Sequence, residues 1–137
     1  MTDRELMELA VAARKNSYAP YSHFHVGAAL VGQSGKVYTG CNIENAGYTP
    51  TNCAERTALF KAVSEGERAF TKIAVVGGMY EDIADFCAPC GVCRQALAEF
   101  CDGDFGVLLG TPENIRKYTL KELLPFSFGK SDLSEKE

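Results

Sequence analysis

Two short cysteine motifs, far apart along the chain, place the strongest constraint on how this sequence can fold. They are residues 53–56 (Cys-Ala-Glu-Arg) and residues 89–95 (Pro-Cys-Gly-Val-Cys-Arg-Gln). Cys90 and Cys93 have the spacing that lets two sulfurs reach one ion from the start of a helix. Cys53 also lies at an expected helix start. The fold must therefore bring two helix N-termini together if all three sulfurs share an ion.

The expected ligands are soft sulfur atoms, which favour zinc over magnesium, calcium or manganese. A helix N-terminus stabilises thiolates because its backbone N–H groups and the positive end of its dipole face the sulfur. Zinc with four protein ligands stabilises a fold, whereas zinc with three ligands and a water performs chemistry. The sequence predicts one Zn²⁺ per subunit, held by Cys53, Cys90 and Cys93, with an open fourth position.

A closed structural site with four sulfurs is an alternative, because Cys87 stands three residues before Cys90. The residue before a proline avoids the helical region. Pro89 is therefore expected to keep Cys87 away from the helix start that carries the other two cysteines. Cys41 and Cys101, at the expected ends of a strand and a helix, are expected to be small core residues or half-exposed thiols.

Two other uses of these residues stay open. A thioredoxin-like redox pair of Cys90 and Cys93 matches the spacing, but it leaves the Cys-Ala-Glu motif unexplained. His23 and His25 are expected on one face at the start of a strand and are candidate ligands. With three sulfurs available, we expect these histidines to be solvated or hydrogen-bonded instead.

Glu55 is the candidate general base, because it lies in the first turn of the same expected helix as Cys53. Zinc lowers the pKa of a bound water from about 15.7 to about 7. A nearby carboxylate can accept that proton and pass it to a substrate nitrogen. A glutamate that only complements the helix dipole is the alternative. Since three thiolates leave an excess of negative charge, Arg56 is expected to donate to the sulfurs, with Arg94 as the other candidate.

The chain as a whole indicates one globular domain, residues 1–137, with a flexible tail at about 130–137. The net charge of -4, with scattered Lys and Arg, argues against a nucleic-acid partner. No stretch approaches the ~20 apolar residues of a membrane helix, and no signal peptide is visible. We therefore expect a cytoplasmic protein without a membrane partner, whose cysteines are metal ligands or free thiols rather than disulfides.

Hydrophobic periodicity and turn residues predict a layered α/β domain with helices packed on one sheet. A capping box at residues 2–5 starts the first helix. The pattern at 118–119 also fits the end of a further strand, in addition to the four that the next sentence gives. The expected helices are 3–16, 53–66, 90–101 and 119–124, and the expected strands are 26–31, 36–41, 72–78 and 105–109.

At these residues the chain resembles the zinc-dependent nucleoside deaminases, and more specifically the short, homotetrameric cytidine deaminases. Residues 53–55 and 89–93 match the zinc deaminase signature, with Cys in place of His as the first ligand. The resemblance covers nearly the whole chain and implies a three-layer fold, with a mixed five-stranded sheet sandwiched by helices. The other matching motifs are residues 18–22 with Phe24, 26–29, 40–45 and 94–95.

The resemblance implies hydrolysis of cytidine and 2′-deoxycytidine to uridine and 2′-deoxyuridine, with release of ammonia, as in pyrimidine salvage. Glu55 would move protons from water to ring N3 and then to the leaving amine. Phe24 would stack near the pyrimidine, and backbone groups at Cys53 and Ala54 would contact the base edge. Asn42 and Glu44 would bind the ribose, chiefly its 3′-hydroxyl, although ordinary loop hydrogen bonding is the alternative for both.

The resemblance also implies a homotetramer in which neighbouring subunits contribute to each site. Phe126 and Phe128 would be unusual exposed aromatics on a monomer. Phe128 is the best match to a C-terminal Phe that enters a neighbour's active site, and Tyr48 resembles a residue near the subunit interface. Three rival functions remain: deamination of nucleic-acid cytosine, which would need a basic surface; deamination of a cytosine nucleoside antibiotic, whose enzymes typically lack the string at 42–44; and a structural zinc module.

Overall fold

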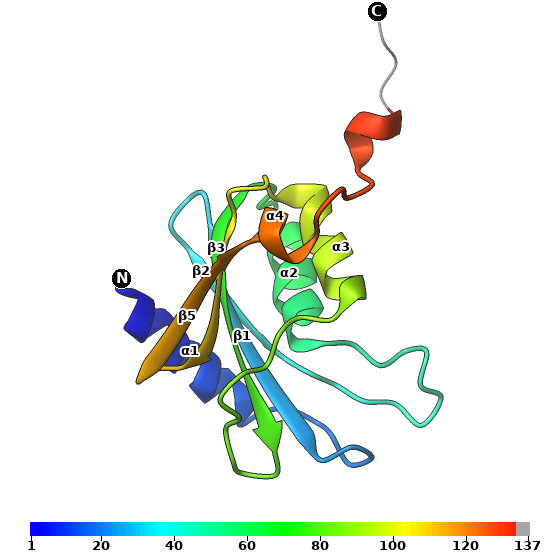
Figure 1. The fold of residues 1–137 in the computed structure, drawn as a ribbon. Coiled ribbons are helices and arrows are strands. Elements are labelled where there is room, and N and C mark those ends of the chain that lie inside the picture. Colours follow the sequence, from blue (N-terminus) through cyan, green and yellow to red (C-terminus); the bar gives the residue numbers. More distant parts are fainter. Residues whose placement is uncertain (134–137) are drawn as a thin grey trace, which may run out of the picture.

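The computed structural model describes residues 1–133, and the mixed sheet with helices on both faces confirms the expected α/β fold (Figure 1). Helix α1 lies on one face of the sheet, and α2, α3 and α4 lie on the other (Figure 1). In chain order the elements are α1 (Asp3–Arg14), β1 (Phe24–Gly32), β2 (Val37–Cys41), α2 (Ala54–Ser64), β3 (Phe70–Met79), α3 (Gly91–Phe100), β4 (Gly106–Thr111), β5 (Asn114–Thr119), α4 (Leu120–Leu123) and a 3-10 helix (Lys130–Leu133).

The sheet has the strand order β2-β1-β3-β4-β5. Strand β1 is antiparallel to both of its neighbours, whereas β3 and β4 are parallel and are connected through α3. Phe24 at the start of β1 pairs with Met79 at the end of β3, and Gly27 of β1 pairs with Cys41 at the end of β2. The start of β1 and the ends of β2 and β3 therefore lie at one end of the sheet, from which the chain enters α2 and α3.

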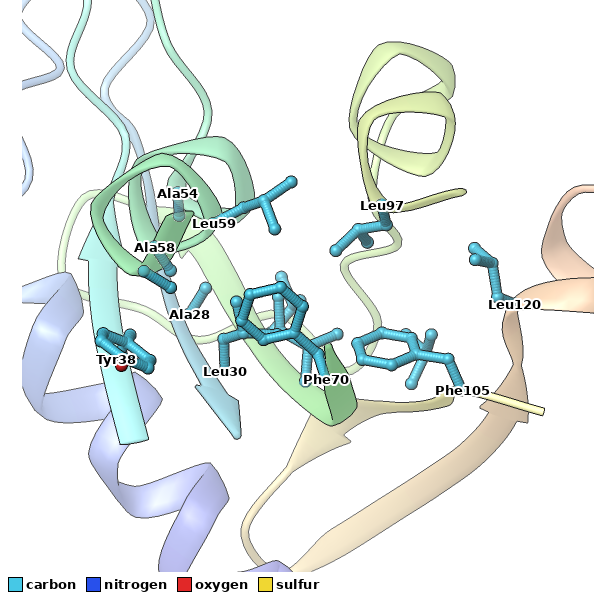
Figure 2. Packing of buried hydrophobic residues seen from close by; sticks show 14 of the residues in the cluster. Ala28, Leu30, Tyr38, Ala54, Ala58, Leu59, Phe70, Leu97, Phe105 and Leu120 are labelled. Carbon is cyan, nitrogen blue, oxygen red and sulfur yellow. The ribbon is translucent and has the colours of Figure 1, made fainter. Parts of the chain in front are cut away.

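Both faces of the central strands are buried, which explains their continuous apolar sequences. In β1, Ala28 and Leu30 face the core beneath α2 and α3, whereas Ala29 faces the smaller core beneath α1. Figure 2 shows the first of these cores, where Leu59 of α2 and Leu97 of α3 project over the sheet. Burial of these side chains holds both helices against the same sheet face.

Two glycines allow the helices to lie very close to the sheet. A Cβ atom at Gly27 would be only 2.0 Å from the carbonyl oxygen of Ala10 in α1. A Cβ atom at Gly40 would be 2.5 Å from the backbone nitrogen of Ala58 in α2. Any larger residue would push a helix backbone away, since backbone atoms cannot rotate aside. The contact at Gly40 therefore fixes the position of the helix that begins directly after Cys53.

Several expectations about the elements are confirmed. Thr2 and Glu5 form the capping box, with 3.1 Å from the Glu5 amide nitrogen to Thr2 Oγ1 and 2.8 Å from the Thr2 amide nitrogen to Glu5 Oε1. The further strand that the pattern at 118–119 allowed is β5, an edge strand whose polar residues fit its exposure. Within residues 1–133 no helix is both long enough and apolar enough to cross a membrane.

The expectation that His23 and His25 share a strand face is wrong. His23 lies in the turn before β1 with a φ of 59°, so the strand begins one residue later. Its ring stacks on Tyr80, with centroids 5.0 Å apart, whereas His25 Nδ1 lies 2.6 Å from Ser17 Oγ. In the expected tail, residues 130–133 form a 3-10 helix, and residues 134–137 lie outside the described part of the chain.

Candidate metal centre

The three predicted ligands lie together, with their sulfur atoms all within 4.8 Å of one another. Cys53 Sγ is 3.9 Å from Cys90 Sγ, which is 3.5 Å from Cys93 Sγ. Sulfurs placed 2.3 Å from a shared tetrahedral ion lie about 3.8 Å apart. Cys53 and Cys90 are the N-cap residues of α2 and α3, and neither side chain makes a capping hydrogen bond. The sulfurs are therefore free to bind an ion between the two helix ends.

Arg56 supports this site with positive charge. Its Nη2 donates to Cys53 Sγ at 3.3 Å, while its buried Nε has no hydrogen-bond partner among the described residues. The hydrogen bond from the Cys93 thiol, together with Arg56, lowers the pKa of Cys53 to about 5 although burial opposes this. Hydrogen bonding to Cys53 and burial raise the pKa of Cys93. Three sulfurs so close together need a bound cation before all can be anionic, as a zinc site requires.

Arg94 has a different role from the one considered above. Its Nε donates to the carbonyl of Pro89 at 2.7 Å, and its Nη1 donates to the carbonyl of Leu123 at 2.6 Å. The guanidinium therefore joins the segment before α3 to the end of α4. Of the two arginines, Arg56 is the one that contacts a ligand sulfur.

Cys87 does not belong to the three-sulfur group. Its Sγ packs against β3, at 2.6 Å from the position that a Cβ of Gly77 would occupy. Burial raises the pKa of Cys87 to about 12 and that of Cys101 also to about 12, and it raises the pKa of Cys41. Such thiols stay protonated near neutral pH. A closed site with four cysteine ligands is thus not formed within residues 1–133.

Glu55 lies beside the cluster in the first turn of α2, with only 4% of its surface exposed. Burial raises the pKa of Glu55 to about 7, and the charge of Cys53 acts in the same direction. A buried carboxyl group with this pKa can both accept and release a proton near neutral pH. The adjacent Ala54, the first residue of α2, is fully buried.

The loop after β2 is joined both to the start of β1 and to the residue before the first cysteine. Asn42 Nδ2 donates to the Phe24 carbonyl at 2.8 Å, and Asn42 Oδ1 accepts from the Val26 amide at 2.9 Å. Ile43 exchanges two backbone hydrogen bonds of 2.9 Å with Asn52, which directly precedes the N-cap of α2. These contacts place the predicted substrate residues at the same end of the sheet as the cysteine cluster.

Glu44 is held by a residue that the sequence did not single out. Its Oε1 accepts from the amides of Tyr21 and Ser22 at 3.0 and 3.1 Å, and its Oε2 accepts from Ser22 Oγ. Despite desolvation, these hydrogen bonds lower the pKa of Glu44. Ser22 was visible only as a member of the motif at 18–22. Its role depends on a contact between segments 22 residues apart.

The aromatic side chains assigned to contacts with neighbouring subunits are exposed in the single chain. Tyr48 is 76% exposed and Phe128 is 61% exposed, and Phe126 is fully exposed. Tyr48 and Phe126 also have positive φ angles of 61° and 53°, which orient them in tight turns. The Phe128 carbonyl accepts from Gln95 Nε2 of α3 at 2.8 Å. The segment after α4 extends outward from the sheet and helices (Figure 1).

A mixed sheet that brings three cysteine sulfurs and a buried carboxylate to one end defines a metal-dependent enzyme domain. Residues 1–109 match the family model described as the cytidine and deoxycytidylate deaminase zinc-binding region. A cytidine deaminase of Sporosarcina psychrophila is 49% identical over 135 residues, which cover 98% of this chain and 96% of that relative. The chain belongs to the cytidine and deoxycytidylate deaminase zinc-binding family.

Comparison with solved structures agrees with this assignment. The 1.6 Å crystal structure of cytidine deaminase from Burkholderia pseudomallei is similar, with a TM-score of 0.85 and 48% identity. The similarity covers 93% of this chain and 100% of that chain. A blasticidin-S deaminase of Bacillus cereus is a more distant relative, 33% identical over 130 residues, or 92% of this chain and 91% of that protein.

Proposed function

We propose that this protein is a zinc-dependent cytidine deaminase that converts cytidine and 2′-deoxycytidine to uridine and 2′-deoxyuridine and releases ammonia, as in pyrimidine salvage. The observation that carries the proposal is the buried carboxyl group of Glu55 beside the three-sulfur group. The relative named cytidine deaminase that is 49% identical supports the choice of substrate. We also propose one domain over residues 1–137, acting in the cytoplasm, where free cysteines stay reduced.

In this proposal Cys53, Cys90 and Cys93 hold Zn²⁺, and Arg56 balances the charge of the sulfurs. Bound zinc supplies Lewis acidity, which lowers the pKa of a water at the open position. Glu55 would accept a proton from the attacking water and deliver it to ring N3. It would then take the second proton from the new C4 hydroxyl group and deliver it to the leaving amine, which departs as ammonia. Its burial suits this role because a carboxyl group with a pKa of about 7 gains and loses protons easily at neutral pH.

The substrate side of the site is assigned to the loop after β2 and the start of β1. The Phe24 ring packs over Gly77, where a Cβ would be 3.2 Å from Phe24 Cε2, and we propose that it stacks near the pyrimidine. Asn42 and Glu44 would bind the 3′-hydroxyl, and backbone groups at Ala54 would contact the base edge. Since both cytidine and 2′-deoxycytidine carry a 3′-hydroxyl, the same contacts serve both.

The proposed activity is tested by incubating the zinc-loaded protein with cytidine and following the loss of ultraviolet absorbance as cytosine becomes uracil. We expect turnover of cytidine and 2′-deoxycytidine and none of a cytosine-containing oligonucleotide, since the net charge of -4 disfavours phosphate binding. Blasticidin S is the second candidate substrate, because of the 33% identical relative. Turnover of blasticidin S without turnover of either nucleoside would replace this proposal.

We further propose a homotetramer in which Tyr48 and Phe128 contribute to a neighbouring site. The support is the exposure of both aromatic rings, together with that of Phe126, because large exposed apolar groups are commonly buried in contacts between chains. Sedimentation velocity is expected to give a mass four times the 14.9 kDa of one chain. A mass equal to that of one chain would contradict this assembly.

A further inference from the structure

The Ser22 hydroxyl connects two residues with proposed roles in substrate binding. It donates to Glu44 Oε2, the carboxylate assigned to the ribose. The same oxygen accepts from the backbone amide of Phe24 at 3.0 Å, and Phe24 carries the ring assigned to the base. One side chain thus joins the ribose-binding group to the segment that presents the base-stacking group.

The hydrogen bonds to Glu44 leave little freedom to its carboxylate. A carboxylate offers about four acceptor positions. The amides of Tyr21 and Ser22 occupy Oε1, and the Ser22 hydroxyl occupies one position of Oε2. The remaining position on Oε2 is available to an incoming hydroxyl donor. Ser22 therefore determines which direction this last acceptor position faces.

The turn that carries Ser22 is itself well braced. His23 adopts a left-handed conformation, with a φ of 59°. Its amide donates to the Ala19 carbonyl at 3.0 Å, and its carbonyl accepts from the Tyr80 amide at 2.7 Å. Stacking of the His23 and Tyr80 rings adds a further contact to the end of β3. The Ser22 hydroxyl is thus presented by a turn that contacts with Ala19 and Tyr80 hold in place, in addition to the hydrogen bonds that Glu44 accepts from it.

Asn42 and Glu44 differ in how they are held. The two hydrogen bonds of the Asn42 side-chain amide go to backbone groups of β1, so no other side chain can be removed to test its placement. Glu44 is also held by backbone amides, but the contact at Oε2 comes from a side chain. Ser22 is therefore the position at which the orientation of a proposed ribose-binding group can be changed without deleting that group.

We propose that Ser22 is a positioning residue that aims Glu44 at the 3′-hydroxyl of the substrate and so sets the preference for nucleosides carrying it. This inference rests on the proposed function, because the role of Glu44 in binding the ribose was assigned there. Without the hydroxyl, Oε2 loses its fixed donor and the carboxylate can rotate. A carboxylate aimed in advance binds the hydroxyl without the cost of ordering it first.

The test compares kcat and KM of Ser22→Ala with those of the parent, using cytidine and 3′-deoxycytidine as substrates. For cytidine we expect kcat/KM to fall by roughly 5- to 20-fold, mainly through KM, because a charge-assisted hydrogen bond loses its alignment. For 3′-deoxycytidine we expect a change below about twofold, since it lacks the hydroxyl. Ser22→Thr keeps the hydroxyl and is expected to restore the preference.

Ser34→Ala is the matched control. Ser34 lies at the turn between β1 and β2, and its Oγ donates to Glu67 Oε1. This variant therefore also deletes a serine hydroxyl that donates a hydrogen bond to a glutamate. We expect Ser34→Ala to leave kcat/KM unchanged for both substrates. An equal loss for both substrates with Ser22→Ala, and an unchanged ratio of their kcat/KM values, would show that Ser22 only supports the fold. Inactivity of the zinc-loaded parent would instead overturn the proposed function.

Discussion

Replacement of Glu55 by glutamine is expected to lower kcat for cytidine by about 10²–10⁴-fold while the protein keeps its zinc. Glutamine has nearly the same shape as glutamate, so it fits the buried position at the start of α2. It cannot accept and return protons, which the proposed mechanism requires of this side chain. The measurement is the rate of absorbance loss with cytidine, made on samples whose zinc content has been determined.

Glu99→Gln is a suitable control for this variant. Glu99 lies on α3 and is exposed, so the same chemical change there leaves the buried site untouched. Parent-like activity in Glu99→Gln, together with loss of activity in zinc-loaded Glu55→Gln, would assign proton transfer to Glu55. A zinc-loaded Glu55→Gln protein with more than about a tenth of the parent kcat would be inconsistent with general acid–base catalysis by this residue.

Replacement of Cys53 by alanine is expected to reduce bound zinc from one ion per chain to nearly none, and to remove turnover with it. Two of the three sulfurs would remain, and both lie at the start of α3. The ion would no longer hold the N-termini of α2 and α3 together. Since metal binding adds to folding free energy, we also expect a lower melting temperature. Metal analysis and thermal unfolding measure the two effects on one sample.

Cys101→Ala separates loss of a ligand from loss of any cysteine. Cys101 follows α3, packs partly against the core and is not in the sulfur group. We expect this variant to retain one zinc ion and to lose only the stability of a small buried group. One ion per chain in Cys53→Ala would show that another group completes the site. Cys87 would then be the first residue to examine, because of its short spacing from Cys90.

The parts of the site that could be predicted are those governed by short-range spacing. Two cysteines separated by two residues reach one ion from a helix start. Cys53 and Glu55 likewise lie within the first turn of one helix, so their closeness could also be predicted from their spacing. The capping box at Thr2 and Glu5 is equally local, and the structure contains it. Continuous apolar runs such as residues 73–76 likewise indicated buried strands, because successive side chains of a strand point to opposite faces of the sheet.

The tertiary structure decided the features that depend on contacts between distant segments. Sequence spacing allowed Cys87 as a fourth ligand, but its sulfur packs against β3 instead. It allowed Arg94 near the sulfurs, but that guanidinium donates to the carbonyl of Pro89 before α3 and to the carbonyl of Leu123 at the end of α4. The left-handed turn at His23 and the bridge from Ser22 to Glu44 were not predicted.

The physical reason is the same for each of these differences. A side chain with several chemically suitable partners forms its hydrogen bond with the partner that the folded chain brings within about 3 Å. The amino-acid sequence thus determined which chemistry this protein can carry, through its cysteines and the carboxylate beside them. The tertiary structure determined which polar groups support that chemistry, because their hydrogen bonds join residues that only the folded sheet places together.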